Sequence, residues 1–244
     1  MGEKHVTANK DLNHWRSEID KVDGELRKLL AKRMECALEV AKAKESNQQE
    51  NAQEDPIYYR PGREAQMMRG LAGELKTSLG EFPTRAAIQV WRELISASIM
   101  AQALGLSVAV ADETCQLLAQ AHFGAVSKIE VHPSALQVLK EVESGRAIIG
   151  IVDDQGLVDI SNAPSSVNVV GLLPFVRPSA TANRYVLARQ AMEPSGDDLH
   201  LYRLPDTPEG KATLKTINAS DELDEASQKD ARFLGGYARP LELS

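Results

Sequence analysis

The sequence has few of the features that mark secreted or membrane-bound proteins. Cysteine occurs only at Cys36 and Cys115, and neither has a second Cys or His at ligand spacing, which argues against a disulfide framework and a metal site. No apolar run approaches the roughly 18 residues of a membrane span, and the polar start, residues 1–5, lacks the apolar region of a signal peptide. We therefore expect a cytoplasmic protein in which both cysteines are small core residues.

Basic residues are also in the minority, with 28 Lys and Arg against 35 Asp and Glu, giving a net charge of -7. Because nucleic acids and anionic membranes require a basic surface, this charge argues against both as main partners. The chain of 244 residues is nevertheless 43% hydrophobic, which is enough to bury a core. A globular protein with a small-molecule ligand remains the favoured class.

Apolar residues near the start of the chain alternate spacings of three and four, which is typical of one face of a helix. We call this the apolar seam of the first helix: Leu12, Trp15, Ile19, Val22, Leu26 and Leu29. The pattern predicts a helix from about Asn9 to Lys44 or beyond, roughly 50 Å long, which exceeds the width of a compact hundred-residue domain. Such a helix requires a partner.

The rest of the chain divides into a helical and a mixed part. Two more helices are predicted over 61–76 and 84–103, and after Gly105 the pattern changes to short apolar runs. Strands at 106–110, 128–131 and 147–152 with helices at 113–123 and 133–143 predict a β-α-β-α-β unit with parallel strands. Further strands are predicted at 183–190, 199–204 and 231–237, with 205–229 polar and partly helical. The fold class is α plus α/β, with a helical domain over 8–104 and an α/β domain over 105–244.

Cations interrupt the apolar faces. Arg33 stands where the seam predicts an apolar residue, and Lys44 lies within about 40° of the same helix direction. A single long cation on such a face can extend to water, but a shared pair implies a compensating anion. The inner face of the third helix turns polar at Ser98 and Gln102. Glu64, beside Arg63, is the only nearby acid by spacing, so a bound anion completes the charge balance.

Arg16 lies seventeen positions before Arg33, about 25 Å along a helix and roughly 100° around it. It cannot join the same pocket within one chain. If two copies of the long helix pack antiparallel, Arg16 of one approaches the segment from Arg33 to Lys44 of the other. We therefore expect a homodimer through the first helix.

Three stretches carry a resemblance to a known family: Leu12 to Lys44, Tyr58 to Glu64, and Leu94 to Gln102. They resemble the all-helical chorismate mutases, in the form fused at the front of bifunctional chorismate mutase–prephenate dehydratases. The resemblance implies that the partner's Arg16 and this chain's Arg33 bind the substrate carboxylates. It further implies that Lys44 and Gln102 contact the ether oxygen, that Glu64 binds the ring hydroxyl, and that Arg63 and Ser98 complete the site.

The implied reaction, chorismate to prephenate, is a unimolecular rearrangement that needs no nucleophile, metal or cofactor. The enzyme must hold the dianion in its folded conformer and stabilise charge developing on the ether oxygen. Two alternatives remain open at this point. A related helical lyase that removes pyruvate from isochorismate also needs a cationic pocket, and a non-catalytic scaffold could bind chorismate or an effector.

The second half resembles a reduced dehydratase, with matches over 108–152 and at a returning strand from Ala182 to Leu187, where Asn183-Arg184-Tyr185 departs from the family's Thr-Arg-Phe triplet. Its departures are larger than its matches: Asp153-Asp154-Gln155 replaces an expected Glu-Asn-Ser, and the stretch from Val152 to Asn183 is too short for a second substrate-binding lobe. We expect no dehydratase activity and a structural or interaction role, with Arg184 structural. Amino-acid-binding signatures of a regulatory domain are also missing.

Overall fold

A computed structural model of the chain describes residues 3–50, 57, 59–77, 82–102, 107–125, 127–162, 165–177, 181–206, 212–228 and 230–242. The chain forms two compact units, Met1–Pro56 and Ile57–Ser244, and each is considered by itself. The second unit therefore includes two helices that the sequence assigned to the domain over 8–104. Residues 103–106, where that predicted boundary falls, lie outside the described residues, and the boundary stays a prediction.

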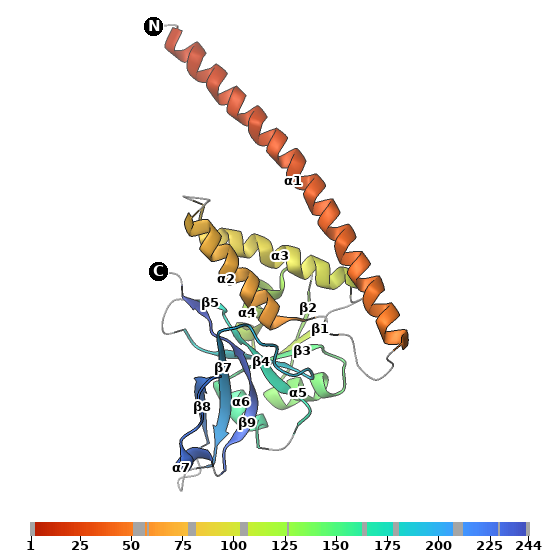
Figure 1. Cartoon of the computed structure of the whole chain (residues 1–244), viewed down its shortest axis with the longest axis vertical. Helices are drawn as coiled ribbons and strands as arrows, with labels where there is room; N and C mark the ends of the chain where they lie inside the picture. The colour runs from red at the N-terminus through yellow and green to blue at the C-terminus, as the bar shows by residue number, and fades with distance from the viewer. Residues whose placement is uncertain are drawn as a thin grey trace. The chain divides into compact units, whose positions relative to one another are not determined.

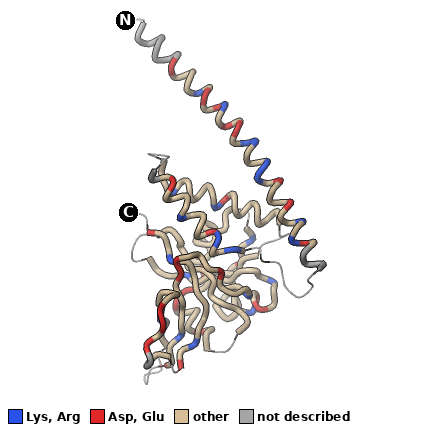
Figure 2. The backbone as a smooth tube through the Cα atoms, in the orientation of Figure 1, with Lys and Arg blue, Asp and Glu red and all other residues tan. Residues whose placement is uncertain are grey.

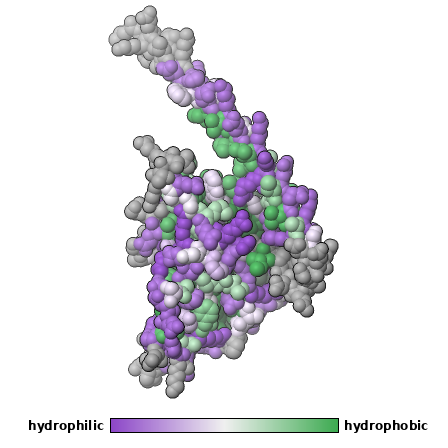
Figure 3. Space-filling view, in the orientation of Figure 1, coloured by the Kyte–Doolittle hydropathy of each residue, from purple (hydrophilic) through white to green (hydrophobic). Residues whose placement is uncertain are grey.

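The first unit is a single helix, α1 (Glu3–Glu50), which extends past both predicted ends (Figure 1). Its 48 residues span about 72 Å at 1.5 Å per residue. The apolar seam is exposed, with Trp15 at 63% and Leu29 at 62%, and it is visible as a hydrophobic stripe on the space-filling surface (Figure 3). Charges of both signs cover the rest of the helix (Figure 2). Cys36 is also exposed, contrary to expectation, because a lone helix has no core of its own.

Two helices begin the second unit as predicted, α2 (Pro61–Thr77) and α3 (Thr84–Gln102). Pro61 opens α2, where its missing N–H costs nothing and its fixed φ suits the first turn. The two helices share a core cluster that includes Met68, Leu75, Ile88 and Phe175. Because Phe175 follows a strand of the sheet, this cluster fixes α2 and α3 to the α/β part of the chain.

The sheet of the second unit has eight strands in the order β2-β1-β3-β6-β4-β9-β7-β8. β1 pairs in parallel with both β2 and β3, which confirms the predicted β-α-β-α-β unit. The bounds of these strands are Ser107–Val110 (β1), Lys128–Val131 (β2), Ile149–Asp153 (β3), Asn168–Leu173 (β4), Arg184–Ala188 (β6), Asp198–Leu204 (β7), Thr213–Asn218 (β8) and Arg232–Ala238 (β9). Two short strands, β5 (Val176–Arg177) and β10 (Leu241–Glu242), pair separately.

Helices cover both faces of the sheet. Side chains alternate along each strand, so Val108 and Val110 pack with α3 and α4 (Glu113–Phe123), whereas Ala109 faces the opposite cluster. That opposite cluster contains α5 (Ala135–Glu143) and α6 (Asp154–Ile160). Cys115 is fully buried on α4, as expected. The architecture is thus a helical segment followed by a mixed α/β sheet domain.

Sequence patterns missed five elements: β4, β5 and α6 between Val152 and Asn183, β8 in the polar stretch 205–229, and β10. The same polar stretch contains the single turn α7 (Glu225–Gln228), in agreement with its expected partly helical character. β8 is an edge strand with half-exposed, largely polar residues, so it lacks the apolar run that marked the inner strands. α6 has only seven residues, too few to show a helical period.

Two glycines provide a matched test of the packing. Gly235 has φ of +131°, and a Cβ there would lie 2.2 Å from the Val169 carbonyl oxygen, where β9 meets β4. Gly235→Ala is therefore expected to lower the free energy of unfolding by at least about 2 kcal/mol. Gly70→Ala on α2, where a Cβ meets nothing within 4 Å, is expected to raise it by about 0.5–1 kcal/mol. Denaturant unfolding of both variants measures these changes in the free energy of unfolding. An unchanged midpoint for Gly235→Ala would contradict the close approach of β9 to β4 at Gly235.

Candidate functional site

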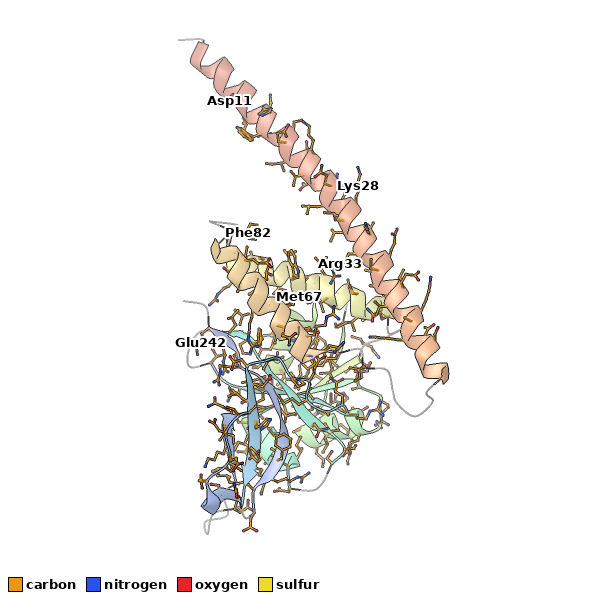
Figure 4. The ribbon with its side chains drawn as sticks, in the orientation of Figure 1. Asp11, Lys28, Arg33, Met67, Phe82 and Glu242 are labelled. Carbon is orange, nitrogen blue, oxygen red and sulfur yellow. The ribbon has the colours of Figure 1, made fainter. Side chains whose placement is uncertain are left out.

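Three of the predicted site residues lie on α1: Arg16, Arg33 and Lys44. Because α1 is one continuous helix, Arg16 and Arg33 of the same chain are about 25 Å apart along its axis. Figure 4 shows Arg33 and Lys28 projecting from different points along this helix. The continuity of α1 thus excludes a site that contains both arginines of one chain.

The other predicted residues lie at two places in the second unit. Arg63 and Glu64 are in the first turn of α2, and Ser98 and Gln102 are in the last turns of α3. The backbone N–H of Arg63 donates to Glu193 Oε2 at 3.1 Å, and its side chain is exposed. Ser98 is buried, and its Oγ donates to the Leu94 carbonyl at 2.7 Å. The Nε–H of Arg60, just before α2, donates to the same carboxylate, to Glu193 Oε1 at 2.7 Å.

Glu64 belongs to a buried polar cluster with Arg92 of α3 and His122 of α4, which we call the Glu64 cluster. An Arg92 Nη1 nitrogen contacts His122 Nδ1, and His122 Nε2 lies 3.9 Å from Glu64 Oε2. Arg92 is only 7% exposed. The buried ring of Tyr59 packs edge-on against His122. Three helices and the segment before α2 therefore meet around these polar groups.

Burial shifts the proton equilibria of this cluster. It raises the pKa of Glu64 from 4.5 to about 7, against the opposing effect of the Arg92 charge. Burial, assisted by Arg92, lowers the pKa of His122 well below 6.5. His122 is therefore neutral at pH 7, and we do not regard its 3.9 Å approach to Glu64 as an ion pair. With Nδ1 facing the guanidinium of Arg92, the ring proton resides on Nε2.

Sequence reasoning missed Arg92 and His122. The signal for Arg92 was available, because it stands four positions after Ile88, at a place on the helix where an apolar residue is expected. This is the same irregularity that singled out Arg33. His122 was noted only as part of a dehydratase-like stretch, and no spacing rule connects α4 to α2. Its place became evident only from the packing.

The second unit has two hollows beside this cluster. One, lined by Tyr59, Glu64, Arg92 and His122 among others, measures only about 20 Å³, about the space of one water molecule. The other, of about 180 Å³, lies between α3, α4 and the β4–β5 connection. The hollow at Glu64 is too small for an organic substrate. Among the described residues, no three His, Cys, Asp or Glu side chains are grouped to hold a metal ion.

The polar groups of the dehydratase-like stretches form hydrogen bonds with other residues of the α/β part. Asp112 caps α4 by accepting from the Cys115 N–H at 2.6 Å, and Asp153 caps α6 by accepting from the Gly156 N–H at 2.7 Å. The Tyr185 hydroxyl donates to Asp154 at 3.0 Å. Arg184 donates from Nη1 to the Asn183 carbonyl at 2.9 Å. These contacts give each of the noted residues a structural partner.

Residues 15–103 match the family described as chorismate mutase type II. Over 143 residues the chain is 28% identical to a bifunctional chorismate mutase/prephenate dehydratase of Pseudomonas aeruginosa, covering 58% of this chain and 38% of that protein. The chain thus spans about two-fifths of that relative's length. No described helix is both long and apolar enough to cross a membrane.

Two solved structures are distantly similar. A prephenate dehydratase from Streptococcus mutans has a TM-score of 0.39 at 13% identity, covering 57% of this chain and all of that chain. A structure described as a novel type of quorum quenching acylase has a TM-score of 0.36 at 15% identity, covering 54% of this chain and 94% of its own.

Replacing Glu64 tests the raised pKa. The folded carboxyl holds its proton more tightly than the unfolded one, so the folded state loses stability as the pH rises from 4.5 to about 7. Glu64→Gln removes this titration, and we expect the variant to gain about 2–3 kcal/mol over wild type between pH 5 and pH 8. Denaturant unfolding at several pH values measures the difference. The exposed Glu222→Gln is the control, and parallel curves for wild type and Glu64→Gln would contradict the assignment.

Proposed function

We propose that the protein isomerises chorismate to prephenate, on the premise that residues 15–103 match the family described as chorismate mutase type II. The observation that carries the proposal is the family match together with the polar residues inside it. Arg16, Arg33 and Lys44 on the first helix, and Glu64 and Gln102 on the next two, are all present. The relative with the bifunctional name supports the same activity.

The proposed chemistry uses binding and charge alone. Chorismate breaks one C–O bond and forms one C–C bond within a single molecule, so no proton, nucleophile or electron carrier is consumed. Arg33, with Arg16 of the partner subunit, holds the two carboxylates in the folded conformer by charge-assisted hydrogen bonds. Lys44 and Gln102 donate to the ether oxygen as negative charge develops there. Stabilising that charge in a dry pocket can supply several kcal/mol of the barrier reduction.

Glu64 accepts the ring hydroxyl in this proposal, which requires its ionised form. A carboxyl with a pKa of about 7 is ionised in only about half of the molecules at neutral pH. Arg92 and neutral His122 then act as positioning residues. His122 lies beside the Glu64 carboxyl and contacts Arg92, and in this proposal neither residue contacts the substrate. Arg63 and Ser98 complete the shell in the same proposal.

The apolar seam of α1 supports assembly as a homodimer. A helix of about 72 Å that exposes Leu12, Trp15, Ile19, Val22, Leu26 and Leu29 has a continuous stripe to bury. Each such side chain gains about 1.5–3 kcal/mol when fully covered. An antiparallel second copy covers the stripe and places its Arg16 where the substrate carboxylates need it.

We further propose that the α/β part has no dehydratase activity and supports the helices. Its acids at the strand ends cap helices and accept from Tyr185, so they are not available as catalytic groups. The core shared by α2, α3 and Phe175 gives the α/β part a bracing role.

The direct test is to incubate the purified protein with chorismate and follow each product by chromatography. Prephenate is expected, without phenylpyruvate and without pyruvate. Lys44→Ala and Gln102→Ala should each reduce kcat/KM by at least about a hundredfold, equal to about 2.7 kcal/mol of lost transition-state stabilisation. Lys42→Ala, on the same helix and exposed, is the matched control and should leave the rate unchanged.

Each product tests a different claim. Absence of prephenate would contradict the mutase activity, and formation of pyruvate from isochorismate would favour the lyase. Tight chorismate binding without turnover would favour the scaffold. Phenylpyruvate formed from prephenate would sink the claim that the α/β part is inactive. Normal rates in both the Lys44→Ala and Gln102→Ala proteins would show that the active site does not include these two residues.

Mixing inactive variants tests the shared site. Arg16→Ala and Lys44→Ala proteins are each expected to be inactive as homodimers, since each site then lacks one group. A heterodimer has one site that combines the intact Arg16 and the intact Lys44, so up to about half of wild-type activity per heterodimer should return. Subunit exchange is followed by mass spectrometry of tagged chains. Exchange without any recovered activity would contradict the shared site.

A further inference from the structure

The 180 Å³ pocket between α3, α4 and the β4–β5 connection lies in the second unit, and Gln102 is not among the described residues that line it. One wall is the face of α3 that carries Arg85, Gln89 and Arg92, at spacings of four and three, so the three side chains share one direction. Leu118 and His122 of α4 form the facing wall, four residues apart. All of these residues lie in the second unit, and the pocket therefore exists within one chain.

The walls combine positive charge with apolar surface. Arg85 and Arg92 supply two guanidinium groups, whereas Leu118, Ile88 and Phe175 are apolar. No Asp or Glu is among the described residues that line this pocket. An anion is therefore favoured here over a cation or a zwitterion, because a buried ammonium group would lack a carboxylate partner beside two like charges.

Arg92 is the buried end of the pocket. Its guanidinium lies 6.0 Å from the centre of the Phe175 ring and contacts His122, which carries no charge at neutral pH. Among the carboxyl groups that the structure describes, Glu64, whose pKa is raised to about 7, is the one that acts on Arg92 through its charge. The positive charge of Arg92 is then only partly balanced, and a second carboxylate entering the pocket would complete the balance.

We propose that this pocket binds a small aromatic carboxylate without an amino group. Its volume is close to the roughly 150 Å³ cavity that accommodates benzene in an apolar site. A ring seated between Leu118 and Phe175 gains apolar burial and an aromatic contact. The carboxylate pairs with Arg92 and Arg85 through charge-assisted hydrogen bonds, and Gln89 supplies a further donor.

Occupancy of the pocket affects Glu64, and this consequence rests on the proposed function. Arg92 and His122 line both the pocket and the small hollow at Glu64. A ligand carboxylate that pairs with Arg92 weakens the opposing effect of that charge on Glu64, so a larger fraction of Glu64 becomes protonated. Mutase turnover at pH 7 should therefore fall when the pocket is filled.

The test is calorimetric titration of the full chain with three probes: 3-phenylpropanoate, L-phenylalanine and propanoate. The first should bind with a Kd on the order of 1 mM or tighter, and at least tenfold more tightly than the other two. Arg85→Gln, an exposed position on the pocket wall, should weaken 3-phenylpropanoate at least tenfold. Ala121→Phe, which fills the pocket, should abolish binding. Lys140→Gln on α5 is the matched control and should bind like wild type.

Three outcomes overturn the proposal: L-phenylalanine binding as tightly as 3-phenylpropanoate, propanoate binding as tightly as 3-phenylpropanoate, or unchanged binding in Arg85→Gln. If Ala121→Phe does not fold, Arg85→Gln alone still decides. The mutase assay separates the two proposals. Ligand binding without prephenate formation would support the pocket proposal and contradict the proposed function. Turnover without any ligand binding would support the proposed function and contradict the pocket proposal.

Discussion

The buried charge of Arg92 is the constraint on which the arrangement of the second unit depends. Placing a guanidinium where α2, α3 and α4 meet costs several kcal/mol unless polar groups surround it. The molecule surrounds it with Glu64, neutral His122 and the face of Phe175. These partners come from three different elements, so satisfying one charge fixes α2 against α4 and both against the sheet. The same requirement raises the pKa of Glu64 and leaves the adjoining pocket short of negative charge.

The helix α3 consequently contributes side chains to two different surfaces. Its Arg85–Arg92 face packs toward α4 and Phe175, whereas Ser98 and Gln102, which belong to the proposed substrate site, lie in its last turns. A rigid helix links them, because the intervening residues include buried Ser96 and Ile99. In the proposed function, a change at the Arg92 end reaches the substrate-binding side chains through packed residues, and the contact from Arg92 through His122 toward Glu64 is the shorter route.

Much of this fold could be predicted because its elements have strong periods. The long helix, α2, α3 and the strands from Ser107 to Asp153 follow from apolar spacing, and all but the long helix have bounds within about two residues of prediction. β8 and α6 could not be predicted, since a polar edge strand and a seven-residue helix carry little periodic signal. The candidate site divides in the same way. Helical spacing places Arg33 beside Lys44 on one helix, but which side chains of α2 and α4 meet Arg92 depends on tertiary packing that no local pattern encodes.

The carboxyl ends of parallel strands are where open α/β sheets usually bind ligands, and here those ends are occupied by the chain itself. Asp112 after β1 and Asp153 at the end of β3 accept from helix N–H groups, and Asp154 accepts from Tyr185. Each bond satisfies a donor that a ligand would otherwise meet, so releasing an acid to bind substrate would cost a helix cap of about 1 kcal/mol. These acids are therefore engaged by the chain itself, whereas the buried Nε of Arg184, paired in register with Asp153, has no hydrogen-bond partner among the described residues. The groups with incompletely balanced charge lie instead where the helices meet, around Arg92, and binding by the second unit is expected there.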